Sequence, residues 1–460
     1  MPYPSGELHR SWENVLLNQF HDIIPGSSIH QVYEVTDREY AAIFDRVGAL
    51  SEKALRELAA HVPGDGILVY NPLGFSRSGL VRLGGKTFRA EDVPAMGWKR
   101  IAAVAAESSV AATETTLENR YYKLSLDQTG AIGSLWDKAA GRELALPGHS
   151  LNELTVFEDF PRDYDAWELS RYHTDKSWRF SDVKSARVVR EVGRTGIRQV
   201  IAYDRSEITQ TLYLYDDSPR IDFATEVEWH QQHQILKAVF PFDLHTEEGS
   251  FEIQFGHVKR PTHRNTSWDA AKFEVLGQKW ADLSEDGYGV SLLNDCKYGH
   301  SAEGSTLRLS LLKGATYPDP QADQGHHCFT YSLLPHQGSF REGSTVREAY
   351  ALNQELMASD AACEAPALPA EFSLVSCDAP NIVIETFKEA EDGDGYILRF
   401  YEAWNRRGRV KLHFGLPVAT VEAVDLMEEA ADEPAVMLSG SDVLLPVKCF
   451  EIVTLRIRFQ

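Results

Sequence analysis

The stretch ITQTLYLYDDSPRIDFATEVEW at residues 208–229 decides the fold class of this chain. Apolar side chains recur at alternate positions on both sides of a turn sequence, Asp216 to Pro219. The residues that share one face of this pattern are Ile208, Gln210, Leu212, Leu214, Ile221, Phe223, Val227 and Trp229. Because successive side chains of a strand point to opposite faces, a period of two indicates strands with one buried face. The stretch therefore predicts a long β-hairpin.

Strand patterns of the same kind dominate the chain from Ile67 to its end. They include the alternations at 307–311 and 453–459, and strand patterns follow one another without helical patterns between them. Consecutive strands of this kind pair antiparallel and pack as sandwiches. The sequence shows no fixed-period repeat, which argues against a propeller or solenoid. We therefore predict a mainly β protein built from antiparallel β-sandwich domains.

Two helices are expected before Pro63, at 7–21 and 36–61. The first has an apolar stripe that we predict to be buried, made of Leu8, Trp12, Leu16 and Phe20. Thr36 and Glu39 are spaced as a capping box at the start of the second helix. Its predicted core positions are Tyr40, Ile43, Phe44, Val47, Leu50, Ala54 and Leu58. A short α-helical bundle segment should thus precede the β domains.

Composition changes mark the expected domain boundaries. An Ala/Ser/Thr-rich stretch at 102–116 and the Pro-bearing run CEAPALPA at 363–370 both have the composition of connections. The domains predicted from them are a helical segment at 1–63, a small β domain at 64–116, a large β-sandwich at 117–362 and a small C-terminal β-sandwich at 371–460.

Composition and charge narrow the classes of partner. The 460 residues are 43% hydrophobic and 10% aromatic, which excludes disorder, and their net charge is −22. Nucleic acids and anionic membranes require clustered Lys and Arg, so neither is an expected partner. A neutral sugar tolerates such an acidic protein.

Cysteine usage and the first residues point to one compartment. The five cysteines are widely spaced, with no Cys-x-x-Cys pair, and we expect reduced thiols. The residues 1–7 have no basic or apolar signal region, and no apolar run reaches the length of a membrane span. We therefore expect a cytoplasmic location, in which the sequon at Asn265 carries no glycan.

His21 and Asp22 stand where Pro25 and Gly26 stop the first helix. An imidazole at a rigid helix end, with a neighbouring carboxylate, suits a metal ligand and its hydrogen-bonding acid. The simpler alternative is that His21 caps the last helical carbonyls and Asp22 begins the turn. The residues alone favour this capping role.

The segment ELHRSWENVLLNQFHDIIPGSSI at 7–29 resembles the middle-domain signature of glycoside hydrolase family 38, the α-mannosidases. Further stretches resemble the C-terminal β region of that family and follow in collinear order. They are YNPLGFSR (70–77), LENRYYKLSLDQTGAIGSLWDKAAGRE (117–143), EDFPRDYDAW (158–167), LKAVFPFDL (236–244), FGHVKRPTHRNTSWD (255–269), NDCKYG (294–299), PDPQADQGHHCFTYSLLPH (318–336) and RFYEAWN (399–405). The resemblance covers nearly the whole chain.

The resemblance implies a fold, an activity and the absence of a catalytic domain from this chain. The large β domain should be a galactose-mutarotase-like supersandwich, and the activity should be zinc-dependent, retaining hydrolysis of terminal α-mannosides or oligosaccharides. In the family, the nucleophile and most zinc ligands come from an N-terminal β/α barrel, which this chain lacks. His21 matches a zinc ligand and Asp22 matches an acid that contacts substrate hydroxyls.

It follows from the resemblance that this chain holds one wall of the active site and no catalytic residue of its own. One imidazole cannot hold Zn²⁺, which needs about four ligands, so the metal would be shared with the barrel. We expect the chain alone to be inactive and the barrel to be its partner. Homo-oligomers are common in the family and are an expectation here as well.

A non-catalytic carbohydrate-binding or structural β-sandwich protein is the alternative, and its affinity for sugar would be unaffected by chelators. Self-sufficient hydrolysis by Asp163 and Asp165 is a poor third option, because neighbouring loop acids do not ensure the required carboxyl separation. The loops 159–167, 260–268 and 319–327 have the composition of sugar-binding loops, but no residue in them is singled out.

Two histidine pairs and one His–Asp pair are weak metal candidates. HTDKSW at 173–178 fits the family's His-x-Asp-x-x-Trp zinc pattern, but it does not follow an apolar barrel strand, so we interpret the match with His173 and Asp175 as accidental. His230 and His233 share only a short spacing. His326 and His327 would point to opposite faces of a strand.

Overall fold

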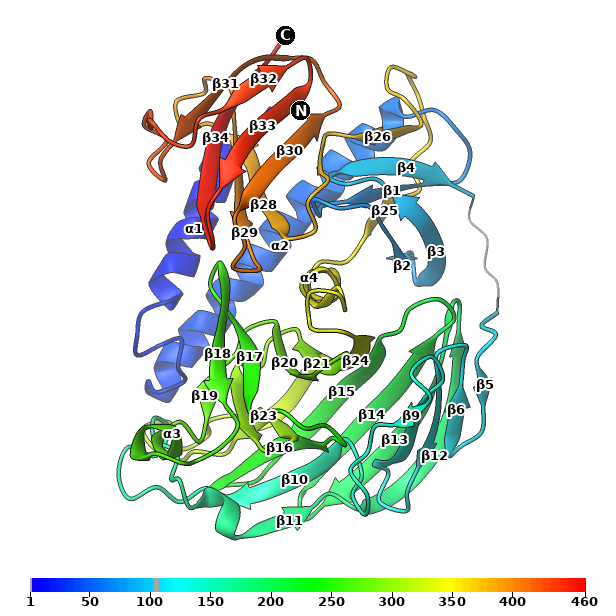
Figure 1. Cartoon of the computed structure of the whole chain (residues 1–460), viewed down its shortest axis with the longest axis vertical. Coiled ribbons are helices and arrows are strands. Elements are labelled where there is room, and N and C mark those ends of the chain that lie inside the picture. Colours follow the sequence, from blue (N-terminus) through cyan, green and yellow to red (C-terminus); the bar gives the residue numbers. More distant parts are fainter. Residues whose placement is uncertain (1, 103–106) are drawn as a thin grey trace.

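The predicted hairpin is present in the computed structural model of the chain, which describes residues 2–102 and 107–460. Strands β14 (Ser206–Tyr215) and β15 (Ile221–Trp229) pair antiparallel, with Leu214 opposite Ile221. All eight residues of the predicted face are buried. The hairpin forms the centre of a large sheet (Figure 1).

Two sheets and a smaller third one make up the large β domain. A core that contains residues from all three lies between them. The nine-stranded sheet has the order β12 (Asp182–Glu191), β13 (Arg194–Tyr203), β14, β15, β24 (Gly325–Gln337), β21 (Tyr288–Asn294), β20 (Trp280–Glu285), β17 (Glu248–Ile253) and β18 (Gly256–Pro261). The six-stranded sheet has the order β11 (Ser177–Arg179), β10 (Glu153–Glu158), β16 (Gln234–Pro241), β23 (Thr306–Lys313), β22 (Gly299–Glu303) and β19 (Val275–Leu276). The five-stranded sheet consists of β5 (Ala111–Ala112), β6 (Thr116–Glu118), β7 (Tyr122–Leu126), β8 (Ile132–Asp137) and β9 (Arg142–Glu143).

Two smaller β units lie above the large domain in Figure 1. The first has the sheet β25 (Met357–Ser359), β1 (Ile67–Asn71), β4 (Gly97–Ile101) and β26 (Glu371–Ser373), with the hairpin β2 (Arg77–Leu83) and β3 (Lys86–Val93). The second packs the sheet β27 (Val375–Cys377), β30 (Gly408–Phe414), β33 (Asp442–Val447) and β32 (Met437–Ser439) against the sheet β28 (Ile382–Glu389), β29 (Tyr396–Glu402), β34 (Ile452–Phe459) and β31 (Val418–Val424). The predicted fold class, antiparallel β-sandwiches after a helical segment, is confirmed.

The sheets differ from the expected domain boundaries at two places. Residues 357–359 and 371–373 return to the first small sheet, where they flank β1 and β4. Part of the predicted connection at 102–116 forms β5 and the start of β6 within the large domain. Residues 103–106 of that connection lie outside the described residues. Local composition indicated loops there, and it carried no information about which distant strand each segment pairs with.

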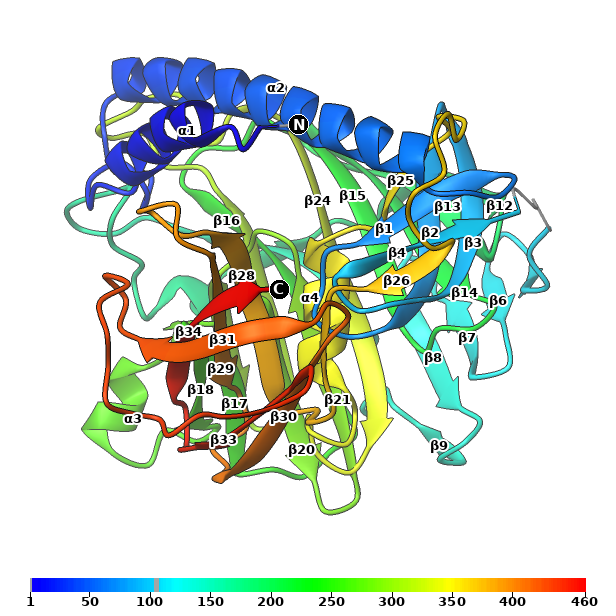
Figure 2. The same ribbon diagram turned by 90° about the horizontal axis from the view of Figure 1, so that it is seen from above.

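Helices α1 (Ser5–Asn18) and α2 (His30–His61) lie along one flank of the molecule (Figure 2). The predicted buried stripe of α1 is wrong, because Trp12 and Leu16 are each 61% exposed and Phe20 is 52% exposed. Polar residues of α1 pack on α2 instead. Asn18 Nδ2 donates to Glu39 Oε2 (2.6 Å), and Arg46 Nη1 donates to Ser11 Oγ (3.0 Å). An apolar face is thus left on the outside of the helix pair.

The start of α2 also differs from the prediction. The helix begins six residues before Thr36, whose hydroxyl donates to Val32 O and Asn18 Oδ1 rather than capping the helix. Of the predicted core positions Ile43 is buried, whereas Phe44 is 72% exposed. Tyr40, Val47, Leu50 and Leu58 are half-buried, and Ala54 is exposed. A pattern of apolar spacing identified the helix but could not tell which neighbour would cover each face.

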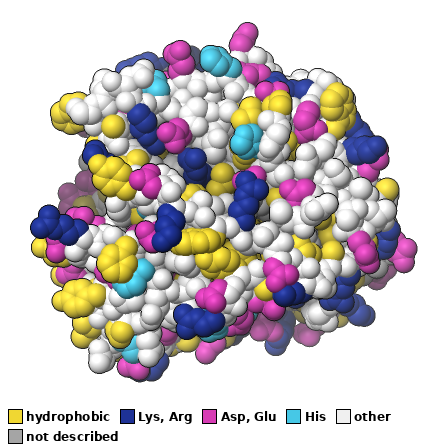
Figure 3. All heavy atoms as spheres, turned by 90° about the horizontal axis from the view of Figure 1, so that it is seen from below, with side chains coloured by type: hydrophobic (Ala, Val, Ile, Leu, Met, Phe, Trp, Pro, Cys, Tyr) yellow, Lys and Arg dark blue, Asp and Glu magenta, His cyan; other side chains and the backbone are white. Residues whose placement is uncertain are grey.

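The remaining helices are short. They are α3 (Ser267–Ala271), α4 (Thr345–Asn353) and the 3₁₀ turn His173–Asp175. Among the described residues, no helix combines the length and the apolar character that a membrane span needs. All five cysteines are free, as predicted. The face in Figure 3 carries acidic and basic side chains interspersed with scattered apolar ones.

Candidate functional site

A contact between His30 and Asp319 joins the helical segment to the large β domain. His30 begins α2, and its Nδ1 lies 3.1 Å from Asp319 Oδ2. The Asp319 carboxylate is buried and also accepts a hydrogen bond from the Gln321 amide at 2.8 Å. The turn at 19–29, which contains His21 and Asp22, is thereby held beside the loop 314–324.

A second loop, 159–168, is fastened to the same place. Asp165 Oδ2 accepts hydrogen bonds from the Thr316 amide (2.5 Å) and hydroxyl (3.0 Å), and the Ala166 amide donates to Tyr317 O (3.0 Å). Asp165 Oδ1 is buried and lies 3.7 Å from His233 Nδ1. Two stretches about 150 residues apart in sequence thus form one surface.

His233 is placed by an unusual backbone conformation. Its φ is 51°, and Tyr164 (φ 55°) and Asp323 (φ 57°) in the adjacent loops are left-handed as well. Left-handed non-glycine residues cost free energy and are concentrated where the surrounding structure requires them, often at functional sites. The His233 ring lies 4.4 Å from the ring of Phe160. The loops are therefore held in a defined shape.

A buried ion pair supports the loops from below. Asp159 has no exposed surface, and Lys313 Nζ lies 2.9 Å from its Oδ2. Lys313 Nζ also donates to Glu168 O at 2.5 Å. Burial raises the pKa of Asp159, although the Lys313 ammonium opposes this shift. The pair fixes both ends of the loop 159–168 to strand β23.

Aromatic side chains protrude from this framework. Phe160, Tyr164, Trp167 and Tyr317 are each between 65% and 69% exposed. Aromatic rings can stack on the apolar side of a sugar while neighbouring carboxylates accept bonds from its hydroxyls. This arrangement suits recognition of a carbohydrate.

His21 and Asp22 are exposed at the edge of the same surface. Their side chains are 74% and 48% exposed, and His21 Nε2 lies 3.4 Å from Asp22 Oδ2. Helix α1 ends at Asn18 and not at residue 21, so both residues lie in the following turn, where Ile23 and Ile24 amides donate to Phe20 O. Among the described residues, no group of three or more His, Cys, Asp or Glu could hold a metal ion. An imidazole is a common Zn²⁺ ligand, but a zinc ion bound by His21 would need further ligands from outside the described residues.

The other residues considered as metal ligands or catalytic acids either lie away from this surface or hold its loops in place. His173 is 5% exposed, its Nδ1 lies 2.8 Å from Ser170 O, and burial lowers its pKa to about 4. Its neighbour Asp175 is exposed. Asp163 is exposed, whereas Asp165 holds Thr316.

In each of the two histidine pairs, the two histidines have different surroundings. His230 is exposed, whereas His233 belongs to the loop surface. His326 Nδ1 lies 2.7 Å from Glu228 Oε1, and His327 Nε2 lies 2.9 Å from Asp323 O, so the two imidazoles have different partners.

Sequence reasoning missed His30 and Thr316 as parts of this surface, and it considered His233 only as a weak metal candidate. The loops 159–167 and 319–327 were identified by composition, and both contribute. The loop 260–268 instead leads into α3, whose capping box joins Thr266 and Asp269. No local signal in the sequence marks His30, because its partner Asp319 is 289 residues away.

Three family models match parts of the chain and together leave out the first small β unit. Residues 117–321 match the model of the glycosyl hydrolases family 38 C-terminal domain. Residues 381–455 match the family 38 C-terminal beta sandwich domain, and residues 1–58 match the alpha mannosidase middle domain. These segments cover most of the large β domain, of the second small β unit and of the helix pair.

Individual relatives agree with these matches. The chain is 36% identical over its whole length to Alpha-mannosidase 2C1 of Homo sapiens and covers 46% of that protein. It is 29% identical to Alpha-mannosidase G of Dictyostelium discoideum, over 99% of this chain and 48% of the relative. The crystal structure of an alpha-mannosidase from Enterococcus faecalis superposes with a TM-score of 0.83 at 16% identity, covering 99% of this chain and 64% of that one, and so shares the fold.

The chain spans about half the length of the curated relatives it matches. Its three matched segments stand in the order helix pair, large β domain and small β-sandwich. The chain therefore belongs to glycosyl hydrolase family 38, of which it carries the middle and C-terminal domains.

Proposed function

We propose that this chain is part of a zinc-dependent retaining α-mannosidase and forms one wall of its active site. Relatives in three species that match over nearly all of its length are named α-mannosidases. The nucleophile and the remaining zinc ligands would come from an N-terminal barrel. The substrate would be a terminal α-mannoside, whose ring would meet the loop surface around Tyr164 and Tyr317.

The exposed apolar face of the helix pair carries this proposal. Trp12, Leu16, Leu17, Phe20 and Ile24 are between 52% and 66% exposed and stand beside His21. Contiguous apolar patches on a protein surface mark sites that another surface covers. A barrel docked on this face would bury the patch and close the site over His21 and Asp22. The missing half of the relatives' length provides a domain of suitable size.

Within this site His21 would supply one imidazole to Zn²⁺. Zinc acts as a Lewis acid that would bind and polarise substrate oxygens. Asp22 lies close enough to His21 to hydrogen-bond its ring or a sugar hydroxyl, and the carboxylate would orient whichever it meets. We place the assembled enzyme in the cytoplasm, where the five free cysteines would stay reduced.

Replacement of His21 tests its role. In the enzyme assembled from this chain and the barrel, His21→Ala should lower both the zinc content and the turnover of a chromogenic α-mannoside at least tenfold. Because His21 is exposed, its replacement should leave the unfolding of this chain unchanged. His149→Ala, at an exposed histidine in the large domain, is the matched control. Unchanged zinc content and rate in His21→Ala would contradict the assignment.

The four exposed aromatics of the loop surface favour one alternative, a non-catalytic carbohydrate-binding protein. Such a protein would bind mannosides without the barrel, and chelators would leave its affinity unchanged. Isothermal titration of methyl α-mannoside into the chain alone, with and without a chelator, separates this alternative from the enzyme.

A further inference from the structure

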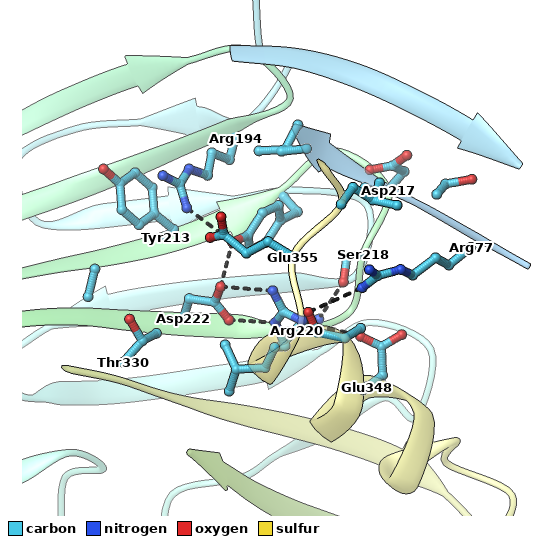
Figure 4. Close-up of a pocket in the computed structure, with 18 of the residues that line it drawn as sticks. Arg77, Arg194, Tyr213, Asp217, Ser218, Arg220, Asp222, Thr330, Glu348 and Glu355 are labelled. Carbon is cyan, nitrogen blue, oxygen red and sulfur yellow. Dashed lines mark hydrogen bonds and ion pairs between the residues drawn. The ribbon is translucent and has the colours of Figure 1, made fainter. Parts of the chain in front are cut away.

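A polar cavity of about 640 Å³ lies between the first small β unit and the large sheet. The hairpin β2–β3 and helix α4 form one side of it, and the outer face of strands β13 to β15 forms the other (Figure 4). Its lining shares no residue with the turn 19–30 or the loops 159–168 and 314–324. The cavity is thus separate from the proposed active site.

Arginine is the only cationic residue type in the lining. The cavity is lined by seven arginines and no lysine, together with seven acidic residues. The arginines are Arg77, Arg82, Arg89, Arg194, Arg198, Arg220 and Arg347. Guanidinium groups offer several fixed N–H donors and match the geometry of an oxyanion. Because the seven arginines and seven acidic residues balance in charge, the cavity has no strong net positive field and is a poor site for a polyanion.

The best-buried acid of the wall is fully engaged in holding an arginine. Asp222 accepts two bonds from Arg220 (2.7 and 3.1 Å), one from Tyr215 (2.5 Å) and one from Ser332 (2.7 Å). Burial opposes ionisation of Asp222, but Arg220 outweighs it and the pKa of Asp222 is lowered. In Figure 4 the Arg220 guanidinium stands between Asp222 and Glu348. Asp222 therefore fixes Arg220 and has no oxygen free to repel a ligand strongly.

A second wall arginine is fixed in the same way. Arg194 donates to Glu191 Oε2 through two nitrogens (2.9 and 2.7 Å) and lies 3.9 Å above the ring of Tyr213. The Tyr213 hydroxyl donates to Glu191 Oε1 at 2.8 Å. Glu191, like Asp222, is thus occupied, and the wall presents preorganised donors to the cavity.

Arg77 is the exception, because its hydrogen-bond partners are neutral. Its Nε donates to Asn71 Oδ1 (2.9 Å) and its Nη1 to Ala351 O (3.4 Å), while Nη2 is buried without a hydrogen-bond partner. Burial lowers the pKa of Arg77 to about 10. A buried guanidinium nitrogen without an acceptor is costly, and a ligand oxygen would remove that cost. Arg347, which also lines the cavity, lies 5.2 Å from the ring of Phe75.

We propose that this cavity binds a small sugar that carries one acidic group, with the oxyanion on Arg77 Nη2 and hydroxyls on the fixed guanidiniums of Arg194 and Arg220. The volume falls in the range of small-molecule sites. The fixed guanidiniums offer donors to ligand hydroxyls, and the carboxylates of Glu226 and Glu355 in the lining offer acceptors. A carboxylate and a phosphate monoester share the chemistry that Arg77 would recognise.

Calorimetric titration of the full chain with hexose 6-phosphates, hexuronates, the unsubstituted hexoses and inorganic phosphate tests the proposal. We expect a hexose 6-phosphate or a hexuronate of the gluco or manno series to bind at least tenfold more tightly than its neutral hexose. The tighter of the two acids identifies the group that Arg77 holds. No binding by either acid, or equal binding by the neutral hexose, would overturn the proposal. Equal binding by inorganic phosphate would overturn its sugar part.

Variants then locate the ligand. Arg77→Gln should weaken binding at least tenfold, and Arg347→Gln provides a second test in case loss of the Arg77 contact to Asn71 disturbs folding. Arg409→Gln, at an exposed arginine of the C-terminal β-sandwich, should bind like the unaltered chain. Unaltered affinity in both cavity variants would refute the assignment.

Discussion

His30 Nδ1 lies 3.1 Å from the buried Oδ2 of Asp319, and this contact fixes the end of the helix pair to a loop of the large β domain. An acid beside the first turn of a helix also benefits from the positive end of the helix dipole. The contact positions the turn that bears His21 relative to the aromatic loops, so the two halves of the proposed site depend on one another.

Removal of the imidazole should loosen that connection. His30→Ala leaves Asp319 with fewer partners, and we expect it to lower the free energy of unfolding by about 1–3 kcal/mol. Urea unfolding and limited proteolysis of the loop 314–324 would measure the effect. Glu34→Ala is the matched control, since Glu34 lies 3.9 Å from the other ring nitrogen and is exposed. Equal stability of the two variants would contradict the role given to the contact.

The exposed apolar face should contribute to assembly and not to folding. Trp12→Ser removes a side chain that is 61% exposed, so the unfolding midpoint of this chain should stay nearly constant. Affinity for the separately produced barrel should fall at least tenfold, because the side chain would be buried there. Surface plasmon resonance measures this affinity. Trp136→Ser, at a tryptophan of β8 that is 43% exposed, should bind the barrel normally.

A buried ion pair within the large β domain should contribute strongly to stability. Lys237 has no exposed surface, and its Nζ lies 2.6 Å from Glu274 Oε2. Lys237→Met should destabilise the chain by roughly 3–5 kcal/mol, because an unpaired carboxylate stays buried. The double variant Lys237→Met/Glu274→Gln should recover most of this loss in denaturant unfolding. A loss below about 1 kcal/mol in the single variant would show that the pair is not the source of stability.

Two buried histidines should make the chain less stable in mild acid. Burial lowers the pKa of His173 and of His300 to about 4. The unfolded chain then binds more protons between pH 6.5 and 4, so stability is full above that window and falls with pH through it. Each histidine should contribute a loss of about 2 kcal/mol between pH 7 and 5.

Unfolding curves at pH 7 and pH 5 measure this loss. His300→Phe should shrink the difference between the two pH values, whatever its effect at pH 7. The exposed control His149→Gln should leave the difference unchanged. A difference that stays the same in His300→Phe would show that other groups titrate instead.

Local sequence patterns were sufficient to predict the strands and to identify the family. The alternation at 208–229 predicted a hairpin, and in the structure Leu212 lies opposite Phe223. This prediction was possible because the alternation of buried and exposed side chains in a strand can be read from a few neighbouring residues. The helices were found as well, but their faces were misjudged at Trp12 and Phe44. A sequence pattern indicates that a helix face is apolar, but it does not indicate which other part of the protein, if any, buries that face.

The candidate site could be predicted only in part, since it is assembled from distant residues. Resemblance pointed to His21 and Asp22, and composition pointed to the loops that carry Tyr164 and Tyr317. The links that unite them, from His30 to Asp319 and from Asp165 to Thr316, join residues 289 and 151 positions apart. Nothing in the neighbouring sequence encodes such a pairing.

The central claim, that this chain is one wall of a divided active site, is tested most directly by an assay of a chromogenic α-mannoside with added zinc. The chain would be measured alone, the barrel alone, and the two after mixing. The account predicts hydrolysis only after mixing, with loss of activity in His21→Ala. Hydrolysis by the chain alone would contradict it, and so would the absence of hydrolysis in a mixture shown to associate.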